Sequence, residues 1–174
     1  MTYKDAIISS MGMLAKDSNT IFIGYNILYG SKAYGTLKDV PMEMCLETPV
    51  AENLMAGLAM GMALEGFRPV LFFERHDFML NALDQIANHI DKISDLSEGQ
   101  YSVPVIIRAT AGAKEPLDPG PQHTQDFTNV FKTLLNFPVL DLKTSEEVLE
   151  GYLLAKSMTS PILVVERRAL YDRE

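Results

Sequence analysis

The residue with the clearest chemical potential in this sequence is Glu52. It ends the stretch ETPVAE at residues 47–52 and lies near the start of a predicted helix that carries no charge from Leu54 to Leu64. A carboxyl group at the mouth of an apolar helix loses water, and desolvation favours its protonated form. Such a group is typical of a working acid or of a paired structural glutamate, and its position alone does not choose between them.

Three histidines and one aromatic residue are further candidates. His123 follows Gly-Pro-Gln at 120–122 and fits either a helix-terminal acid/base or a plain polar cap. Phe78 stands where a turn after a strand meets a helix, a position that by itself favours a core residue. His76, His89 and His123 have neither metal-ligand spacing nor cysteine neighbours, so we expect no metal site made by this chain alone.

Predicted strands and predicted helices alternate along the chain, and these elements would position the candidate residues. Short apolar runs predict strands at 20–24, 42–46, 68–73, 103–107, 137–140 and 161–165. Helical periodicity or capping signals predict helices at about 3–16, 49–66, 78–93, 123–136 and 144–158, with loops at 25–41 and 109–122. This alternation predicts an α/β domain with three layers, in which helices cover both faces of a mostly parallel sheet.

The order of these elements also predicts where a site would form. In open parallel sheets, ligands bind beyond the carboxyl ends of the strands. Glu52, the turn from Glu74 to Phe78 and the loop before His123 all follow predicted strands. We therefore expect them to gather at one edge of the sheet.

The helix after Glu52 has unusual features of its own. We expect Thr48 to cap it and Pro49 to occupy its first turn. Because it is apolar on every side, we expect it to be buried all round. Gly57 and Gly61, four residues apart among alanines, would let a second helix approach closely. This pattern favours a subunit interface, with tight packing onto the domain's own sheet as the alternative.

Composition narrows the class of protein. The length of 174 residues predicts a single domain, and 47% hydrophobic with 22% charged residues is typical of a globular protein. A net charge of −8 argues against nucleic acid and anionic membranes as partners. The single cysteine, Cys45, suits a reducing compartment, and we find neither a secretory signal nor a membrane-spanning run. We therefore expect a cytoplasmic protein.

Five motifs occur in an order that resembles a known family: ETPVAE at 47–52, GFRP at 66–69, Phe78 with ALDQ at 82–85, VPV at 103–105 and QHTQ at 122–125. The order is similar to that in the pyrimidine-binding domain of thiamine-diphosphate enzymes. The best match is the beta subunit of the 2-oxo acid dehydrogenase first component, and transketolase and deoxyxylulose phosphate synthase share the domain. The resemblance covers essentially the whole chain and implies a single pyrimidine-binding domain at 1–174 with the thiamine-diphosphate-binding fold.

The resemblance also implies roles for individual residues. Glu52 matches the glutamate that bonds the aminopyrimidine ring of thiamine diphosphate, where its proton favours the tautomer that can deprotonate C2 of the cofactor. Phe78 matches the aromatic residue that stacks on the pyrimidine, and Val50 matches a position whose backbone lies beside the cofactor. His123 matches the histidine that faces the substrate. Glu74 is assigned to the cofactor side of the site.

Two departures from the family pattern concern the site itself. Family members of this type carry an acidic pair after the first strand, whereas this sequence has Tyr25 and Asn26. Because an amide does not relay protons as a carboxylate does, this change questions any proton path between two active sites. His76 and Glu74 stand where the dehydrogenase subunits have less polar residues. We assign His76 and Asn26 to the substrate side, where His76 would face either a polar substrate such as a sugar or simply solvent.

A third departure concerns the extent of the chain. Family chains continue beyond the last strand into another domain, and the Gly-Asp-Gly…Asn motif that holds the diphosphate and Mg²⁺ is absent from this sequence. The resemblance therefore implies that the diphosphate-binding and C-terminal domains are absent from this chain. It implies a separately encoded diphosphate-binding subunit, which supplies Mg²⁺ and docks on the Gly/Met-rich helix in a heterotetramer or larger assembly.

The resulting hypothesis is a split thiamine-diphosphate enzyme that decarboxylates a 2-oxo acid and transfers the acyl or aldehyde fragment. The QHTQ motif at 122–125, which is nearest to the dehydrogenase type, favours this reaction over its main alternative, ketol transfer on a sugar. A non-catalytic assembly or regulatory subunit with the same fold is a further alternative. A self-sufficient homodimer is the last.

Overall fold

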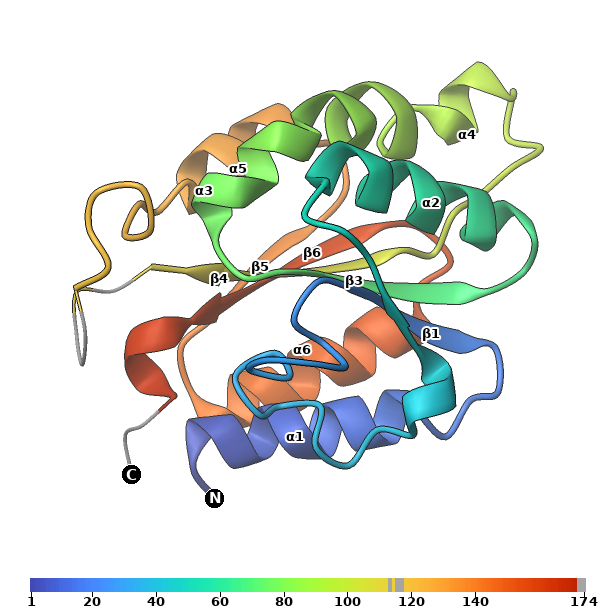
Figure 1. Ribbon diagram of the computed structural model, residues 1–174. Coiled ribbons are helices and arrows are strands. Elements are labelled where there is room, and N and C mark those ends of the chain that lie inside the picture. Colours follow the sequence, from blue (N-terminus) through green and yellow to red (C-terminus); the bar gives the residue numbers. More distant parts are fainter. Residues whose placement is uncertain (113, 115–117, 172–174) are drawn as a thin grey trace.

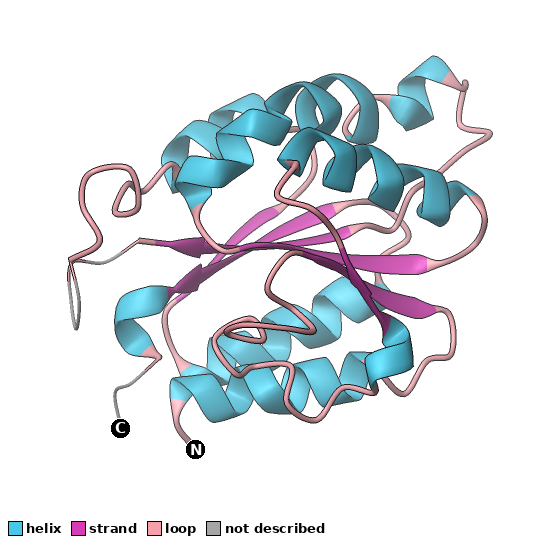
Figure 2. Cartoon of the chain, viewed as in Figure 1, coloured by secondary structure: helices cyan, strands magenta, loops and turns pink. Residues whose placement is uncertain are grey.

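A six-stranded sheet lies between two layers of helices in the computed structural model, which describes residues 1–112, 114 and 118–171 (Figure 1; Figure 2). All strand pairs over these residues are parallel, in the order β2-β1-β3-β4-β6-β5. The predicted α/β class with helices on both faces is confirmed. The strands are β1 (Thr20–Gly24), β2 (Cys45–Glu47), β3 (Arg68–Phe73), β4 (Ile106–Ala111), β5 (Val139–Leu142) and β6 (Ile162–Arg167).

Each helical layer covers one face of the sheet, as Figure 1 shows. One layer contains α1 (Tyr3–Leu14) and α6 (Ser145–Ser157), which pack on each other and on the sheet. The other contains α2 (Glu52–Leu64), α3 (His76–Met79), a 3₁₀ turn (Leu80–Ala82), a π-helical segment (Gln85–Ile90) and α5 (Thr128–Leu134). A short helix, α4 (Ile93–Leu96), follows the π-helical segment. Two further 3₁₀ turns are Met42–Met44 and Arg168–Leu170.

Alternation along each strand divides the core between the two faces. In β3, Leu71 and Phe73 pack against the α2 layer, whereas Val70 and Phe72 pack against the layer of α1 and α6. Successive side chains of a strand point to opposite faces, so a strand buried on both sides is apolar throughout. This explains why continuous apolar runs were a sound sign of parallel strands in this chain.

The predicted capping signals at α1 and α6 are confirmed. Thr2 accepts a hydrogen bond from the N–H of Asp5 at 3.1 Å, and Thr144 accepts one from the N–H of Glu147 at 3.1 Å. The carboxylate of Glu147 accepts the N–H of Lys143, one residue before the cap, at 2.6 Å. The start of α6 therefore resembles a capping box shifted by one residue.

The predicted start of α2 is wrong. The helix begins at Glu52 with Ala51 as an N-cap that makes no side-chain bond. Thr48 is buried at the sheet edge, where its N–H donates to the carbonyl of Gly24 at 2.9 Å. Because the backbone of Thr48 extends the pairing with β1, residues 48–51 form a connection and Pro49 does not enter the helix.

The predicted burial of α2 on all sides is also wrong for this chain. Its buried residues are on one side: Glu52, Met55, Ala56, Ala59 and Ala63. Leu54 and Leu64 are 55% and 40% exposed. A Cβ added at Gly57 would lie 3.6 Å from the side-chain oxygen of Gln85, whereas one at Gly61 would meet nothing within 4 Å. Gly57 thus packs against the π-helical segment of the same domain, whereas Gly61 has free space beside it.

Four other boundaries differ from the prediction. The strand predicted at 42–46 is a 3₁₀ turn followed by β2. The single helix predicted at 78–93 is a series of short helical segments. Of the helix predicted at 123–136, only the part that forms α5 is helical. The strand predicted at 103–107 is β4, which lies three residues later and runs through Arg108. Tertiary contacts decide these limits, because periodicity alone did not mark where each helix breaks.

Arg108 lies in the middle of β4 and is completely buried. Its Nε and Nη2 donate to the carboxylate of Glu166 on β6 at 2.7 and 3.0 Å, and Nη2 also donates to the hydroxyl of Thr36 at 2.7 Å. The hydroxyls of Tyr152 and Tyr171 donate to the same carboxylate. This buried cluster joins α6, the loop after β1 and the end of β6 to the centre of the sheet.

Candidate functional site

Glu52 is the first residue of α2 and is only 6% exposed. Its carboxylate accepts a hydrogen bond from the hydroxyl of Tyr25 and one from the side-chain amide of Asn81, both at 3.4 Å. Both contacts are longer than an ordinary hydrogen bond, and both donors are uncharged. Within the described part of the chain, Glu52 is therefore not the partner of a structural cation.

Tyr25, the residue after β1, has a buried ring. Burial raises the pKa of its hydroxyl, and the nearby carboxylates of Glu52 and Glu74 raise it further. Tyr25 therefore stays protonated near neutral pH and acts as a donor to Glu52. At this position the chain therefore offers Glu52 a neutral hydrogen-bond donor.

Glu47, at the end of β2, holds the backbone that follows Tyr25. Its carboxylate accepts the N–H groups of Asn26, Ile27 and Leu28 at 2.6, 3.0 and 2.7 Å. Asn26 has a positive φ of 57°, and its side-chain oxygen lies against Gly30. The structure therefore places the Asn26 side chain on its own loop, and its assignment to a substrate stays a prediction.

The loop at residues 25–41 packs on Glu74. The hydroxyl of Ser31 donates to the carboxylate of Glu74 at 3.1 Å, and the hydroxyl of Tyr34 donates to its carbonyl at 3.2 Å. Lys32, Ala33 and Tyr34 have φ of 49°, 51° and 59°, which makes a left-handed turn. Such backbone costs free energy for side chains other than glycine and is often found near functional sites. The cofactor role assigned to Glu74 stays a prediction.

The structure brings Phe78 and His123 together. Their rings lie 5.0 Å apart, centroid to centroid, and are nearly perpendicular at 87°. Both side chains are half-buried, and Nδ1 of His123 is buried without a hydrogen-bond partner among the described residues. Phe78 is therefore not simply a core residue, and His123 lies in a turn before α5 rather than at the end of a helix.

Val50 lies on the connection before α2 and is 71% exposed. Val50 is thus open to solvent on the segment that leads into Glu52. Asn81, which contacts Glu52, and Glu47, which anchors the loop after Tyr25, were not singled out from the sequence. No spacing rule marks them, because each acts through a contact between segments that are distant in sequence.

His76 lies inside the domain and is completely buried. Its Nδ1 accepts the N–H of Phe127 at 3.2 Å, and its ring stands edge-on to Phe131 with the centroids 5.2 Å apart. We expected it to face a substrate or solvent, and the structure places it against neither solvent nor the ring of Phe78. A substrate role for His76 stays a prediction that this burial does not support.

Burial of His76 has a consequence for stability against pH. Desolvation lowers the pKa of its imidazole from 6.5 to about 4, although Asp126 and Asp77 act in the opposite direction. Protons therefore bind this group in the unfolded chain before they bind it in the folded chain. The contribution to stability is present above pH 6.5 and is lost as the pH falls towards 4, by about 3 kcal/mol in total.

We expect this loss to be absent from His76→Asn, which has no group that gains a proton in this range. The measurement is the free energy of unfolding of both chains in denaturant from pH 7 to pH 4, with the difference between them as the readout. Equal slopes for the two chains would contradict the assignment.

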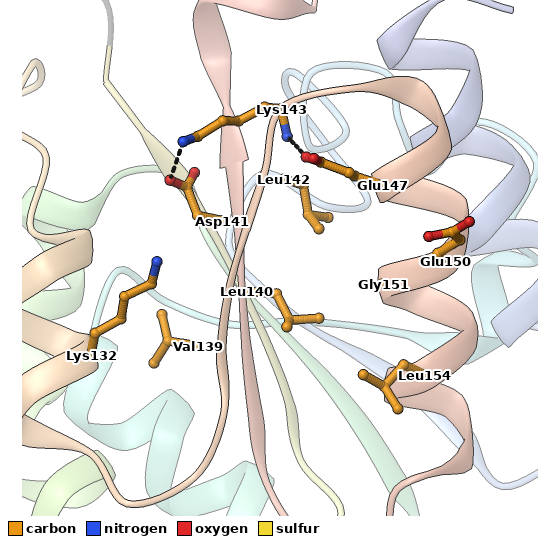
Figure 3. Close-up of a pocket in the computed structure, with 10 residues that line it drawn as sticks. All are labelled: Lys132, Val139, Leu140, Asp141, Leu142, Lys143, Glu147, Glu150, Gly151 and Leu154. Carbon is orange, nitrogen blue, oxygen red and sulfur yellow. Dashed lines mark hydrogen bonds and ion pairs between the residues drawn. The ribbon is translucent and has the colours of Figure 1, made fainter.

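Another hollow lies away from Glu52, Phe78 and His123. A groove of about 390 Å³ follows the free edge of β5, between α5 and α6 (Figure 3). Lys143 contacts Asp141 at 3.5 Å, and Asp141 in turn accepts a bond from Arg167 at 2.7 Å. Charged side chains beside a short edge strand discourage pairing with other strands. This edge is at the opposite end of the sheet from Glu52.

The described residues contain no group of three or more His, Cys, Asp or Glu placed to hold a metal ion. None of their helices is both long enough and apolar enough to cross a membrane.

Known proteins resemble this chain over nearly its whole length. The family described as "Transketolase, pyrimidine binding domain" matches residues 1–173. The pyruvate dehydrogenase E1 component subunit beta of Cyanidium caldarium is 29% identical over 174 residues, which are 96% of this chain and 51% of that protein. The mitochondrial subunit beta of Saccharomyces cerevisiae is 28% identical over 98% of this chain and 48% of its own length.

Solved structures show the same fold. A structure titled "Split gene transketolase, inactive beta4 tetramer" matches with a TM-score of 0.74 and 18% identity, over 97% of this chain and 52% of that one. The transketolase of Campylobacter jejuni matches with a TM-score of 0.76 and 15% identity, over 97% of this chain and 26% of that one. The chain spans about half the length of the curated relatives it matches. It belongs to the transketolase pyrimidine-binding domain family.

Proposed function

We propose that this chain is the pyrimidine-binding subunit of a split thiamine-diphosphate-dependent enzyme. The observation that carries the proposal is Glu52, a buried carboxyl at the start of α2 with only neutral donors for partners. Val50, two residues before Glu52 in the chain, is exposed, and the half-buried ring of Phe78 contacts the ring of His123. A carboxyl, an aromatic surface and an open backbone segment suit the aminopyrimidine ring of the cofactor.

The chemistry of the site follows from these residues. Bound thiamine diphosphate would supply a carbon nucleophile for addition to a carbonyl group. Glu52 would hold a proton at the ring nitrogen of the pyrimidine, in a position from which water is largely excluded. Tyr25 would orient the Glu52 carboxyl without taking its proton, and Phe78 would support the face of the ring. His123 would act towards the substrate, where a neutral imidazole can donate or accept a proton.

We assign the reaction to decarboxylation of a 2-oxo acid with transfer of the acyl or aldehyde fragment. The names of relatives over nearly the whole chain, such as the E1 beta subunits of pyruvate dehydrogenase, support this class. Ketol transfer on a sugar is the second candidate, because transketolase structures have the same fold.

A diphosphate-binding partner completes the proposal, and it would supply Mg²⁺. The relatives are named as subunits, and one structural neighbour is a split-gene transketolase. The open face of α2 offers a docking surface: Leu54 and Leu64 are exposed there, and Gly61 leaves room for a close helix. We propose a heterotetramer or a larger assembly and a cytoplasmic location.

The test begins with the protein that co-purifies with this chain from its host. Exchange of the C2 proton of thiamine diphosphate for deuterium, followed by NMR, should accelerate only when both subunits and Mg²⁺ are present. Tight cofactor binding by this chain alone, measured by calorimetry, would instead support the self-sufficient homodimer. A stable complex that leaves the exchange rate unchanged would support the non-catalytic subunit. Pyruvate, other 2-oxo acids and ketose phosphates then identify the substrate class.

A further inference from the structure

The backbone at residues 123–127 is held closely against the end of β4. The N–H of Gly112 donates to the carbonyl of Gln125 at 3.4 Å. A Cβ added at Gly112 would stand 2.5 Å from Cα of Thr124 and closer still to the carbonyl oxygen of His123. Backbone atoms cannot swing away as a flexible side chain can, so only glycine permits this approach.

His76 holds the same segment from its other end. Its Nδ1 accepts the N–H of Phe127, so this nitrogen must be unprotonated. Burial keeps the pKa of the ring well below neutral, so the acceptor is available at physiological pH. His76 and Phe78 belong to the same turn, α3. The bond to Phe127 thus ties the segment that carries His123 to the turn that carries Phe78.

Polar contacts hold the residues between these two anchors. The side-chain amide of Gln125 donates to Asp77, also in α3, at 2.7 Å. The carboxylate of Asp126 accepts the N–H of Thr128 at 2.9 Å and pairs with Arg167 at the end of β6. Burial alone would raise the pKa of Asp126, but the bonds from Thr128 and Arg167 lower it to about 2. The carboxylate of Asp126 is therefore charged at neutral pH.

We propose that Gly112 and His76 are positioning residues that set His123 against Phe78. Neither touches the ring contact itself; each fixes the backbone from which the imidazole of His123 extends. The contacts that fix this placement all lie within this chain. Its consequence for catalysis rests on the proposed function, in which His123 faces the substrate and Phe78 supports the cofactor.

The test follows the NMR resonances of the His123 ring in the full chain, labelled with ¹³C-histidine. The chain has three histidines, so only three sets of ring resonances need to be assigned. Phe78→Leu removes the aromatic neighbour, so this variant gives the chemical shifts of the His123 ring when no aromatic ring lies beside it. Gly112→Ala should move the His123 chemical shifts towards those of Phe78→Leu. Gly12→Ala, near the end of α1, is the matched control because its Cβ would meet nothing within 4 Å. Unchanged His123 resonances in Gly112→Ala would overturn the role of Gly112.

A second pair of variants tests whether His76 acts through the hydrogen bond that its Nδ1 accepts or only through the volume of its ring. His76→Asn places an oxygen where Nδ1 stands and should keep the resonances of His123, whereas His76→Leu has no acceptor and should shift them. If the His123 resonances are unchanged in His76→Leu, His76 does not position His123. In the complex with the partner, Gly112→Ala should lower kcat about 100-fold, because small misplacements of a reacting group are costly. A wild-type complex without turnover would refute the proposed function, and the resonances would still decide the positioning.

Discussion

Replacing Glu52 with glutamine is expected to reduce turnover of the reconstituted complex by at least about 100-fold, within the range that acid–base groups contribute. Glutamine has nearly the same size as glutamate, and its carbonyl can still accept a bond from the hydroxyl of Tyr25. Its amide has no acidic proton that it could transfer to a pyrimidine nitrogen. The loss should therefore appear in kcat and in C2 exchange, while folding and assembly with the partner remain intact.

The matched control is Glu98→Gln, which makes the same chemical change at an exposed turn. Denaturant unfolding and size-exclusion chromatography of the complex establish that both variants fold and assemble. Turnover is then measured with the substrate found for the wild-type pair. If Glu52→Gln keeps more than about a third of wild-type turnover, Glu52 is not the acid of the cofactor site.

Replacing Arg108 with methionine is expected to destabilise the fold by about 3–5 kcal/mol, which is a large part of the stability of a typical domain. Methionine fills much of the same volume but leaves the carboxylate of Glu166 buried without its cation. Two tyrosine hydroxyls would still donate to that carboxylate, but they do not neutralise it. Guanidinium unfolding, followed by circular dichroism, measures the effect.

Two controls separate the broken pair from the lost volume. The double variant Arg108→Met with Glu166→Leu removes both charges and should recover most of the loss, since a buried ion pair and an apolar pair are often similar in stability. Lys156→Met breaks the partly exposed pair with Asp17, at 3.1 Å, and should cost less than about 1 kcal/mol. If Arg108→Met and Lys156→Met lose similar amounts of unfolding free energy, the buried pair of Arg108 with Glu166 contributes no more to stability than the partly exposed pair.

These two residues differ in how visible they were in the sequence. Glu52 stood out because it precedes a charge-free helix and ends the recognisable motif ETPVAE. Arg108 did not, and the strand that contains it was predicted to end one residue earlier. A charge inside an apolar run normally argues against a buried strand. The partner that makes it acceptable, Glu166, is on another strand, so no local pattern could indicate the pair.

The helices show the same division. The start of α6 was predictable because Thr144 and Glu147 act within one turn. The start of α2 was not, because Thr48 pairs with the carbonyl of Gly24 on a different strand. Similarly, the helical spacing after Phe78 identified a helical region but not its division into α3, a 3₁₀ turn and a π-helical segment.

The sequence by itself therefore determined the class of fold, the order of its elements and the three side chains Glu52, Phe78 and His123 as candidates. These follow from local chemistry: periodicity, caps, and motifs whose residues are close together in the chain. Only the tertiary structure decided which groups surround them. Tyr25, Asn81 and His76 acquire their partners through contacts across the fold, and such contacts depend on the register and packing of elements that a linear pattern does not specify.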